Sequence, residues 1–203
     1  MTGSLVEVRS VGHANGVLRD VSLSLPPATL AVLAGRSGSG KSTLCHLIAG
    51  VMRPSSGEVL VGGKPAHRAV DWATVSLLPQ RLALEPELSV AENVLLPAGV
   101  RGASTDRGLL ERLGLAGIAA RPARDTSLGE QQRTALARAL VLTPAVAVLD
   151  EPTAHQDDEH VELVLTAVRA AVDAGSLAVV ATHDQRVIDI ADTVVRLSSG
   201  QIA

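Results

Sequence analysis

Short blocks of apolar residues, separated by polar turns, recur along the chain. Apolar and polar residues alternate at 5–9 and 21–25, which predicts strands with one face in solvent. Three further runs, at 30–34, 146–149 and 177–181, are apolar throughout, as is typical of strands buried on both faces. Because helical stretches separate the later runs, the pattern favours an α/β fold built on a largely parallel sheet.

The remaining short elements follow from the same periodicity and from turn residues. Strands are expected at 58–61, 74–78 and 193–197, the last of which closes the chain. A loop is expected at 12–16 and a turn at 54–57, where glycine, proline and serine gather.

Helical patterns occupy four stretches between these strands. Their limits follow from caps, glycines and prolines: from residue 44 to before Pro54, 89–113, 129–142, and from 157 to before Gly175. Ser89 stands three residues before Glu92, which predicts a capping box at the start of the second helix. The fourth helix should bury one apolar stripe, made of Val161, Val164, Leu165, Val168 and Val172.

The most informative polar stretch lies between the apolar run at 30–34 and a helical start at 44. It reads Gly35-Arg36-Ser37-Gly38-Ser39-Gly40-Lys41-Ser42-Thr43 and fits the pattern of a phosphate-cradling loop. A helix N-terminus offers unpaired N–H groups to phosphate, and the glycines allow close backbone approach. Lys41 can reach the β- and γ-phosphates, and the Ser42 hydroxyl can ligate Mg²⁺. The alternative, a Gly/Ser turn with an exposed lysine, does not explain the flanking strand and helix, so we expect a nucleoside triphosphate site.

Two acidic residues follow the apolar run at 146–149. A carboxylate at Asp150 can hold Mg²⁺ directly or through water. Glu151 is then well placed to orient a water or take its proton, which hydrolysis still requires once phosphate and metal are held. The alternative is that both acids only cap the following helix.

A second candidate anion site precedes the helix at 129–142. The segment 126–133 offers a hydroxyl at Ser127, a glycine N–H at Gly129 and a helix N-terminus. A chain with one nucleotide loop does not need two sites for the γ-phosphate. The segment therefore predicts contact with a nucleotide held by another subunit.

Composition narrows the class of protein. The 203 residues suit one domain, and the net charge of −3 without a basic block argues against nucleic acid as the main partner. The mean hydropathy of +0.28 is high, yet no run reaches the roughly 18 apolar residues of a membrane span. The N-terminal residues show no signal-peptide pattern, and the single cysteine fits a reducing cytosol. Without phenylalanine or tyrosine, and with Trp72 as the one tryptophan, the core must be aliphatic.

Taken in order, these motifs resemble those of the ATP-binding subunits of ABC transporters, over nearly the whole chain. The resemblance implies a P-loop NTPase fold of the ABC type, in one domain over 1–203. An antiparallel β part would precede an inserted helical subdomain at about 81–140. The matching motifs are Walker A at 35–43, the Q-loop Gln80, the signature at 127–131, Walker B at 146–150 with the catalytic Glu151, the D-loop Asp157 and the switch His183.

The resemblance also implies roles and partners. Each ATP would lie between Walker A of one subunit and the signature of another, in a head-to-tail homodimer or heterodimer. Lys41 and the loop N–H groups would hold the phosphates, and Ser127 and Gly129 would contact the γ-phosphate from the partner. Glu151 would polarise the water, His183 would contact the γ-phosphate, and Mg²⁺ would be served by Ser42, Gln80 and Asp150. The stretch from about 80 to 121 would dock on integral membrane permease subunits, which places the chain in the cytoplasm at the inner face of the cell membrane.

The sequence departs from the family pattern at three places. Leu128 replaces the first glycine of the signature, and His155-Gln156 replaces a pair that usually ends in leucine. We expect His155 to be a solvated residue, and the alternative is a metal role with Asp157 and His160. The aromatic residue that normally stacks on adenine is missing, and His13 is the nearby ring. We therefore expect weak base selectivity, because base stacking is worth about 1–3 kcal/mol.

Two other functions compete with that of a transporter ATPase. One is a soluble ABC ATPase of DNA repair or translation, although 44–126 leaves no room for a long coiled coil and the chain has one such domain. The other is an ATP-gated clamp that dimerises without turnover, against which Glu151 and His183 both argue. Residues 82–97 are similar to the macrolide-exporter and lipoprotein-releasing group, although related stretches occur in importers.

Overall fold

The computed structural model describes residues 3–13, 16–69, 72–99, 105–106 and 108–203. Its strands are β1 (Val6–His13), β2 (Leu18–Leu25), β3 (Thr29–Ala34), β4 (Ser56–Val61), β5 (Lys64–Pro65), β6 (Val75–Leu78), β7 (Val146–Asp150), β8 (Leu177–Thr182), β9 (Thr193–Ser198) and β10 (Gln201–Ile202). Its α-helices are α1 (Lys41–Ile48), α2 (Val90–Gly99), α3 (Leu109–Arg112), α4 (Leu128–Leu140), α5 (Asp158–Asp173) and α6 (Gln185–Asp189). Short 3₁₀ turns occupy Ala66–Arg68, Ala116–Ile118 and Ala123–Asp125.

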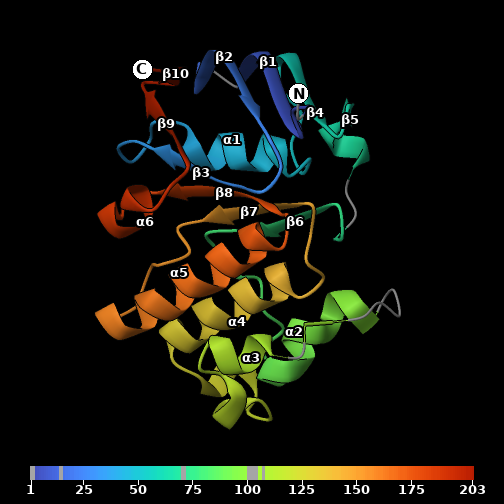
Figure 1. Ribbon diagram of the computed structural model, residues 1–203, viewed down its shortest axis with the longest axis vertical. Helices are drawn as coiled ribbons and strands as arrows, with labels where there is room; N and C mark the ends of the chain where they lie inside the picture. The colour runs from blue at the N-terminus through green and yellow to red at the C-terminus, as the bar shows by residue number, and fades with distance from the viewer. Residues whose placement is uncertain (1–2, 14–15, 70–71, 100–104, 107) are drawn as a thin grey trace.

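The strands form two sheets (Figure 1). The larger sheet has the order β10-β9-β3-β8-β7-β6, and every pair from β9 to β6 is parallel. The smaller sheet, β2-β1-β4-β5, is antiparallel. The α/β class with a largely parallel core sheet and an antiparallel N-terminal part is therefore confirmed.

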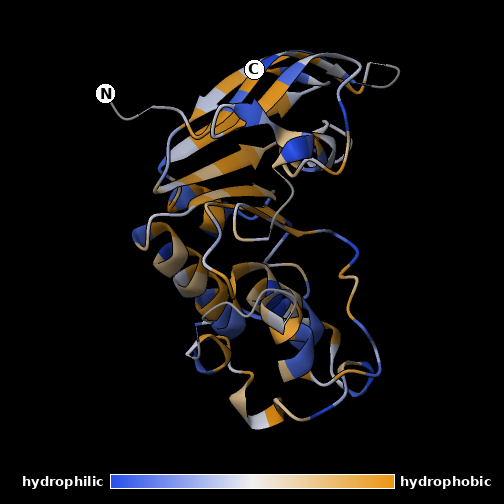
Figure 2. Cartoon of the chain, turned by 90° about the vertical axis from the view of Figure 1, so that its right-hand side faces the viewer, coloured by the Kyte–Doolittle hydropathy of each residue, from blue (hydrophilic) through white to orange (hydrophobic). Residues whose placement is uncertain are grey.

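The layers explain why the central strands are apolar on both faces. Helix α1 lies between the two sheets, whereas α4 and α5 cover the opposite face of the larger sheet and α2 packs on α4 (Figure 1). Along β3, Ala31 and Leu33 pack toward α1, and Leu30 and Val32 pack toward the helical layer. All four side chains are fully buried, and the central strands are among the most hydrophobic segments in Figure 2. The core is aliphatic, as the composition predicts.

Several boundaries differ from the sequence prediction. Strand β1 runs through the first part of the expected loop at 12–16, because Gly12 pairs with Ser56 across a register shift in the β1–β4 ladder. Residues 14–15 of that loop lie outside the described residues. Strand β10 follows β9 and pairs with it antiparallel, so β9 does not close the chain. In α5, Ala167 is buried and Leu165 is only partly buried.

The expected helix at 89–113 is two shorter ones. Helix α2 ends at Gly99, residues 105 and 106 are not helical, and α3 begins at Leu109. Pro97 lacks an N–H donor, and Gly99, as a glycine, is a weak helix former. Neither residue favours continuation of α2 beyond residue 99. Residues 100–104 and 107 lie outside the description.

The parallel strands place the chemistry. The carboxyl ends of β3, β6, β7 and β8 meet at one edge of the sheet, where ligands bind in folds of this kind. The phosphate loop follows β3, Gln80 follows β6, and Glu151 follows β7. The segment between β6 and β7 carries α2, α3 and α4. Among the described residues, no helix has the length and apolar character needed to span a membrane.

Candidate functional site

A cavity of about 790 Å³ lies at this edge of the larger sheet. Its walls come from the phosphate loop and from the ends of β6, β7 and β8. It is lined by Arg36, Ser37, Gly38, Gly40, Lys41, Ser42, Thr43, Gln80, Asp150, Glu151 and His183, together with Val17, Gln132, Ala154 and His155. The structure thus brings most of the sequence-predicted residues together in one place, although they are spread over nearly 150 positions of the chain.

The phosphate loop is built as its sequence requires. Helix α1 begins at Lys41 directly after Gly40, whose φ of 104° lies in the left-handed region. A Cβ on Gly40 would also come within 2.6 Å of Leu18 Cδ2. Both the backbone conformation and this neighbour therefore disfavour a side chain at position 40. The Lys41 ammonium donates to the carbonyl of Gly35 at 2.8 Å and is 8% exposed. Lys41, Ser42 and Thr43 of the first turn of α1 line the cavity, and the N–H groups at a helix start lack intrahelical partners, as an anion site requires.

Asp150 ends β7 and is almost fully buried, with 1% of its surface exposed. Burial raises the pKa of its carboxyl, and a hydrogen bond from Ser42 opposes that rise. Its Oδ2 atom is buried and has no hydrogen-bond partner among the described residues. A buried oxygen of this kind beside the Ser42 hydroxyl fits one ligand position of Mg²⁺, and the Gln80 amide lines the same cavity.

Glu151 is held in a different way from its neighbour. Its backbone adopts a φ of 50°, which is uncommon for a residue other than glycine. The carboxylate accepts a hydrogen bond from Thr182 Oγ1 at 3.0 Å and lies 3.0 Å from His183 Nδ1. Both partners come from the end of β8, and the His183 side chain is 82% exposed. The structure therefore aims a carboxylate and an imidazole at the cavity as one hydrogen-bonded pair.

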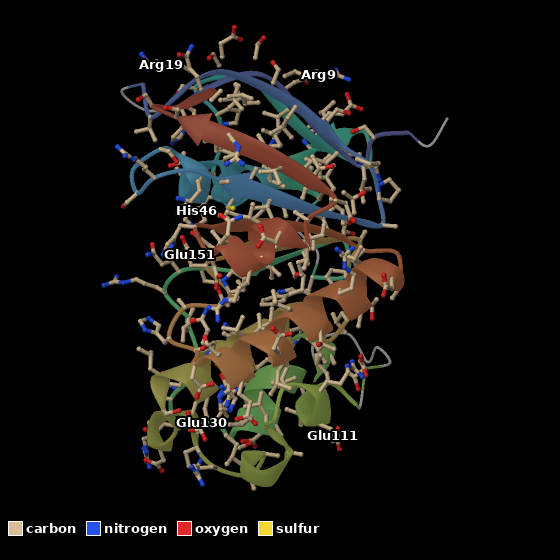
Figure 3. All side chains as sticks on the ribbon, turned by 60° about the vertical axis from the view of Figure 1, so that its left-hand side comes forward. Arg9, Arg19, His46, Glu111, Glu130 and Glu151 are labelled. Atoms are coloured by element: carbon tan, nitrogen blue, oxygen red, sulfur yellow. The ribbon has the colours of Figure 1, made fainter. Side chains whose placement is uncertain are left out.

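The signature segment lies elsewhere on the chain. Ser127 caps α4 by accepting from the N–H of Glu130, and the Glu130 carboxylate accepts from the N–H of Ser127 at 2.7 Å. These hydrogen bonds hold the pKa of Glu130 below its usual range. Ser127 and Gly129 do not line the cavity. Figure 3 shows Glu130 in the helical part, away from Glu151 at the central sheet.

Three other expectations can be placed. Asp157 does not line the cavity but caps α5, accepting from the N–H of His160, which holds the pKa of Asp157 below its usual range. A metal role for His155 with Asp157 and His160 finds no support, since the described residues contain no cluster of three such side chains suited to a metal. His13 does not line the cavity; Val17 does.

Sequence reasoning missed Val17, Gln132, Ala154, His155 and Thr182 as parts of the site. Gln132 donates from Nε2 to the carbonyl of Glu151 at 3.0 Å. Its signal was present in the sequence, because Gln132 is polar yet falls on the apolar-periodic side of α4, where it is 3% exposed. Thr182 had a weaker signal as a hydroxyl that ends an apolar strand.

A second cavity of about 420 Å³ lies between the segment after Gln80 and the start of α4. Its apolar lining includes Leu82, Leu84 and Leu128, and Leu128 is 50% exposed. The buried Arg138 donates to the carbonyls of Leu82 and Ala83, both at 2.8 Å, which fixes the segment that follows Gln80. This cavity borders both Gln80 and the signature.

The family model for ABC transporters matches residues 18–154, which contain the phosphate loop, Gln80, the signature and the acidic pair. The chain belongs to the ABC transporter family. It is 38% identical over 212 residues to the Fe(3+) ions import ATP-binding protein FbpC of Agrobacterium fabrum, covering 99% of this chain and 60% of FbpC. It is 38% identical over 200 residues to the lipoprotein-releasing system ATP-binding protein LolD of Maricaulis maris, covering 92% of this chain and 87% of LolD.

A solved ABC structure has a similar fold over nearly the whole chain. It is a dimer of the ATP-binding cassette MJ0796 in a post-hydrolysis state, bound to ADP and Pi. The TM-score is 0.88 at 26% identity, and the match covers 97% of this chain and 96% of that chain. This ABC chain spans 60 to 64% of the length of several of its first curated relatives.

Proposed function

We propose that the chain binds and hydrolyses ATP as the nucleotide-binding subunit of an ABC transporter. The observation that carries the proposal is the single cavity that joins the phosphate loop, the buried Asp150 and the paired Glu151 and His183. A site that only bound nucleotide would not require a carboxylate held at the cavity by Thr182, the last residue of β8, and His183, which follows it.

The residues of the cavity have separate roles in binding phosphate, holding Mg²⁺ and activating water. The loop N–H groups and Lys41 bind the β- and γ-phosphates of ATP, and the lysine exchanges its present carbonyl partners for phosphate oxygens. Ser42, Gln80 and Asp150 would hold Mg²⁺, which when bound neutralises charge on the phosphate oxygens. Glu151 orients the attacking water and takes its proton, while His183 contacts the γ-phosphate. Together these roles describe hydrolysis of the terminal phosphate.

The signature segment completes a second subunit's site. Ser127 and Gly129 lie outside this chain's own cavity, at the N-terminus of a helix of 13 residues. A helix N-terminus attracts anions, and the γ-phosphate of a partner's ATP is the anion that this arrangement suits. The dimer of MJ0796 supports a pair of subunits, which we propose to lie head to tail as a homodimer or a heterodimer.

The membrane subunit docks on the helical part. The apolar second cavity borders Gln80, so a permease segment seated there can sense the nucleotide through that side chain. We propose accordingly that the chain lies in the cytoplasm at the inner face of the cell membrane. The relatives include both an importer subunit and a lipoprotein-releasing subunit, so they favour neither direction of transport.

Phosphate release tests the enzymatic part of the proposal. Glu151→Gln keeps the shape of the side chain but removes the base, so the rate should fall by about 100-fold or more. The matched control is Glu162→Gln, an exposed glutamate on α5, which should match wild type. Equal, measurable rates for Glu151→Gln and wild type would overturn the role assigned to Glu151, and a wild type that releases no phosphate would favour the ATP-gated clamp.

Copurification from detergent-solubilised membranes tests the transporter part. We expect a tagged chain to retain an integral membrane permease, identified by mass spectrometry. Recovery of soluble partners alone, from intact membranes, would favour the soluble ABC ATPase.

A further inference from the structure

The start of α4 and the segment after β7 are joined by two reciprocal hydrogen bonds. Gln132, on α4, donates from Nε2 to the carbonyl of Glu151 at 3.0 Å. Gln156, after β7, donates from Nε2 to the carbonyl of Gly129 at 3.0 Å. Each segment thus uses one glutamine to hold the other segment's backbone. We call this pair of bonds the glutamine clasp.

The buried side chain of Arg133 holds Gln156 in this position. Arg133 donates from Nη1 to Gln156 Oε1 at 2.6 Å and from Nε to the carbonyl of Leu113 at 2.9 Å. It is 5% exposed, and burial lowers the pKa of its guanidinium. Both polar ends of the Gln156 amide are therefore satisfied, which leaves its rotamer little freedom.

The two segments also approach at close range. A Cβ on Gly129 would lie 2.9 Å from the carbonyl oxygen of His155, a distance that real side chains do not reach. Gly129 is therefore required by the neighbouring segment of its own chain, apart from any contact with phosphate. The absence of a side chain lets the His155 carbonyl lie against the start of α4, next to Gln156.

The segment after β7 adopts an unfavourable backbone conformation that neighbouring contacts must stabilise. Glu151 and His155 adopt φ values of 50° and 62°, in the left-handed region. Such a conformation is unfavourable for residues other than glycine and persists only where neighbouring contacts fix it. The glutamine clasp supplies contacts at both ends of this segment.

We propose that Gln132 and Gln156 are positioning residues that couple the two nucleotide sites of the dimer. The inference rests on the proposed function, in which Glu151 acts on the chain's own ATP and Ser127 and Gly129 contact the partner's ATP. The clasp joins these two parts within one chain. When α4 moves toward the partner's γ-phosphate, the clasp draws the backbone of Glu151 with it, and the reverse also holds by linkage.

The coupling predicts cooperative hydrolysis that depends on Gln156. Phosphate release by the full chain is measured against ATP concentration for wild type, Gln156→Leu and Gln156→Glu. Gln156→Glu keeps an acceptor for Arg133 but loses the donor to Gly129. We expect a Hill coefficient above unity for wild type, a fall toward unity in both variants, and a kcat lower by about two- to tenfold, as for one lost hydrogen bond.

Two controls separate positioning from folding. Gln185→Leu removes an exposed glutamine that donates to Asp189 on the same helix, and its Hill coefficient should equal that of wild type. Thermal melting monitors folding, and Gln156→Glu keeps the test informative where Gln156→Leu is destabilised. An unchanged Hill coefficient in both Gln156 variants, or a non-cooperative wild type, overturns the coupling and leaves the proposed function standing. A wild type without hydrolysis overturns the proposed function and this inference with it.

Discussion

Asp150 and Glu151 are neighbours in sequence whose carboxyl groups are held in opposite ways. Asp150 is buried with one oxygen lacking a partner, whereas the Glu151 carboxylate is hydrogen-bonded by Thr182 and lies beside His183. The first arrangement destabilises a charge until a cation arrives, and the second orients a charge toward the cavity. One strand end therefore provides two carboxylates in different electrostatic surroundings.

Asp150→Asn should stabilise the protein in the absence of nucleotide and metal. Because burial raises the pKa of Asp150, the folded state resists the charged form, so wild type loses stability as pH rises above the ordinary aspartate range. The asparagine variant avoids this loss. Its Tm should exceed that of wild type at neutral pH, by about 2–4 °C for each kcal/mol.

The pH dependence provides the check on that reasoning. Below the ordinary aspartate pKa the carboxyl is protonated in both folded and unfolded chains, so the two melting temperatures should converge. Melts recorded across the acid range would show this. A variant less stable than wild type at neutral pH would contradict the assignment of an uncompensated charge.

Weak base selectivity is a second prediction at the residue scale. The cavity wall near the phosphate loop is Val17, which is 40% exposed, and His13 does not line the cavity. A valine offers apolar contact but no ring to stack on a base. Dissociation constants for ATP and GTP, measured by equilibrium titration, should agree within about tenfold, because base stacking is worth about 1–3 kcal/mol. Tight ATP binding with far weaker GTP binding would refute this prediction.

At the scale of elements, helices α2 and α4 begin in the same way. Ser89 and Glu92 exchange hydrogen bonds between side chain and backbone, and Ser127 and Glu130 do the same. The first capping box was predicted from sequence spacing and is confirmed. The second lies in the signature, where the same serine is proposed to contact a partner's nucleotide.

This likeness allows a matched comparison. Ser89→Ala and Ser127→Ala should each destabilise the fold by about 1 kcal/mol, since each removes one helix cap. Only Ser127→Ala should slow ATP hydrolysis, by about tenfold to a hundredfold, as for a hydrogen bond to a charged group. Melting temperature and phosphate release would be measured on the same preparations. Equal hydrolysis rates in the two variants would assign Ser127 a capping role alone.

The sequence predicted the elements whose pattern is local. The apolar runs at 30–34, 146–149 and 177–181 are central strands, and the phosphate loop lies between β3 and α1 as expected. The sequence could not show that β1 extends to His13 or that Gln156 bonds Gly129, because both depend on pairing between distant segments. Residues 35–43, Asp150 and Glu151 were predictable because their chemistry depends on their position beside a strand end.

For the whole molecule, the proposed sites require two subunits. Glu151→Gln should form a stable dimer when ATP and Mg²⁺ are present, because both half-sites keep their grip on a γ-phosphate that is not removed. Light scattering should show about twice the monomer mass for this variant. Wild type and nucleotide-free samples serve as controls. A monomer mass at all ATP concentrations would contradict a homodimer and favour a heterodimer or a need for the permease.

The lack of aromatic residues in the core limits which spectroscopic signals can report on this protein. Phenylalanine and tyrosine are absent from the chain, and Trp72 is 43% exposed. Intrinsic fluorescence therefore reports one surface position before β6 and stays silent while the interior rearranges. Far-ultraviolet circular dichroism follows the helices and strands directly, and absorbance at 280 nm understates the amount of protein. A tryptophan introduced near the nucleotide would therefore give a fluorescence signal with only Trp72 as background.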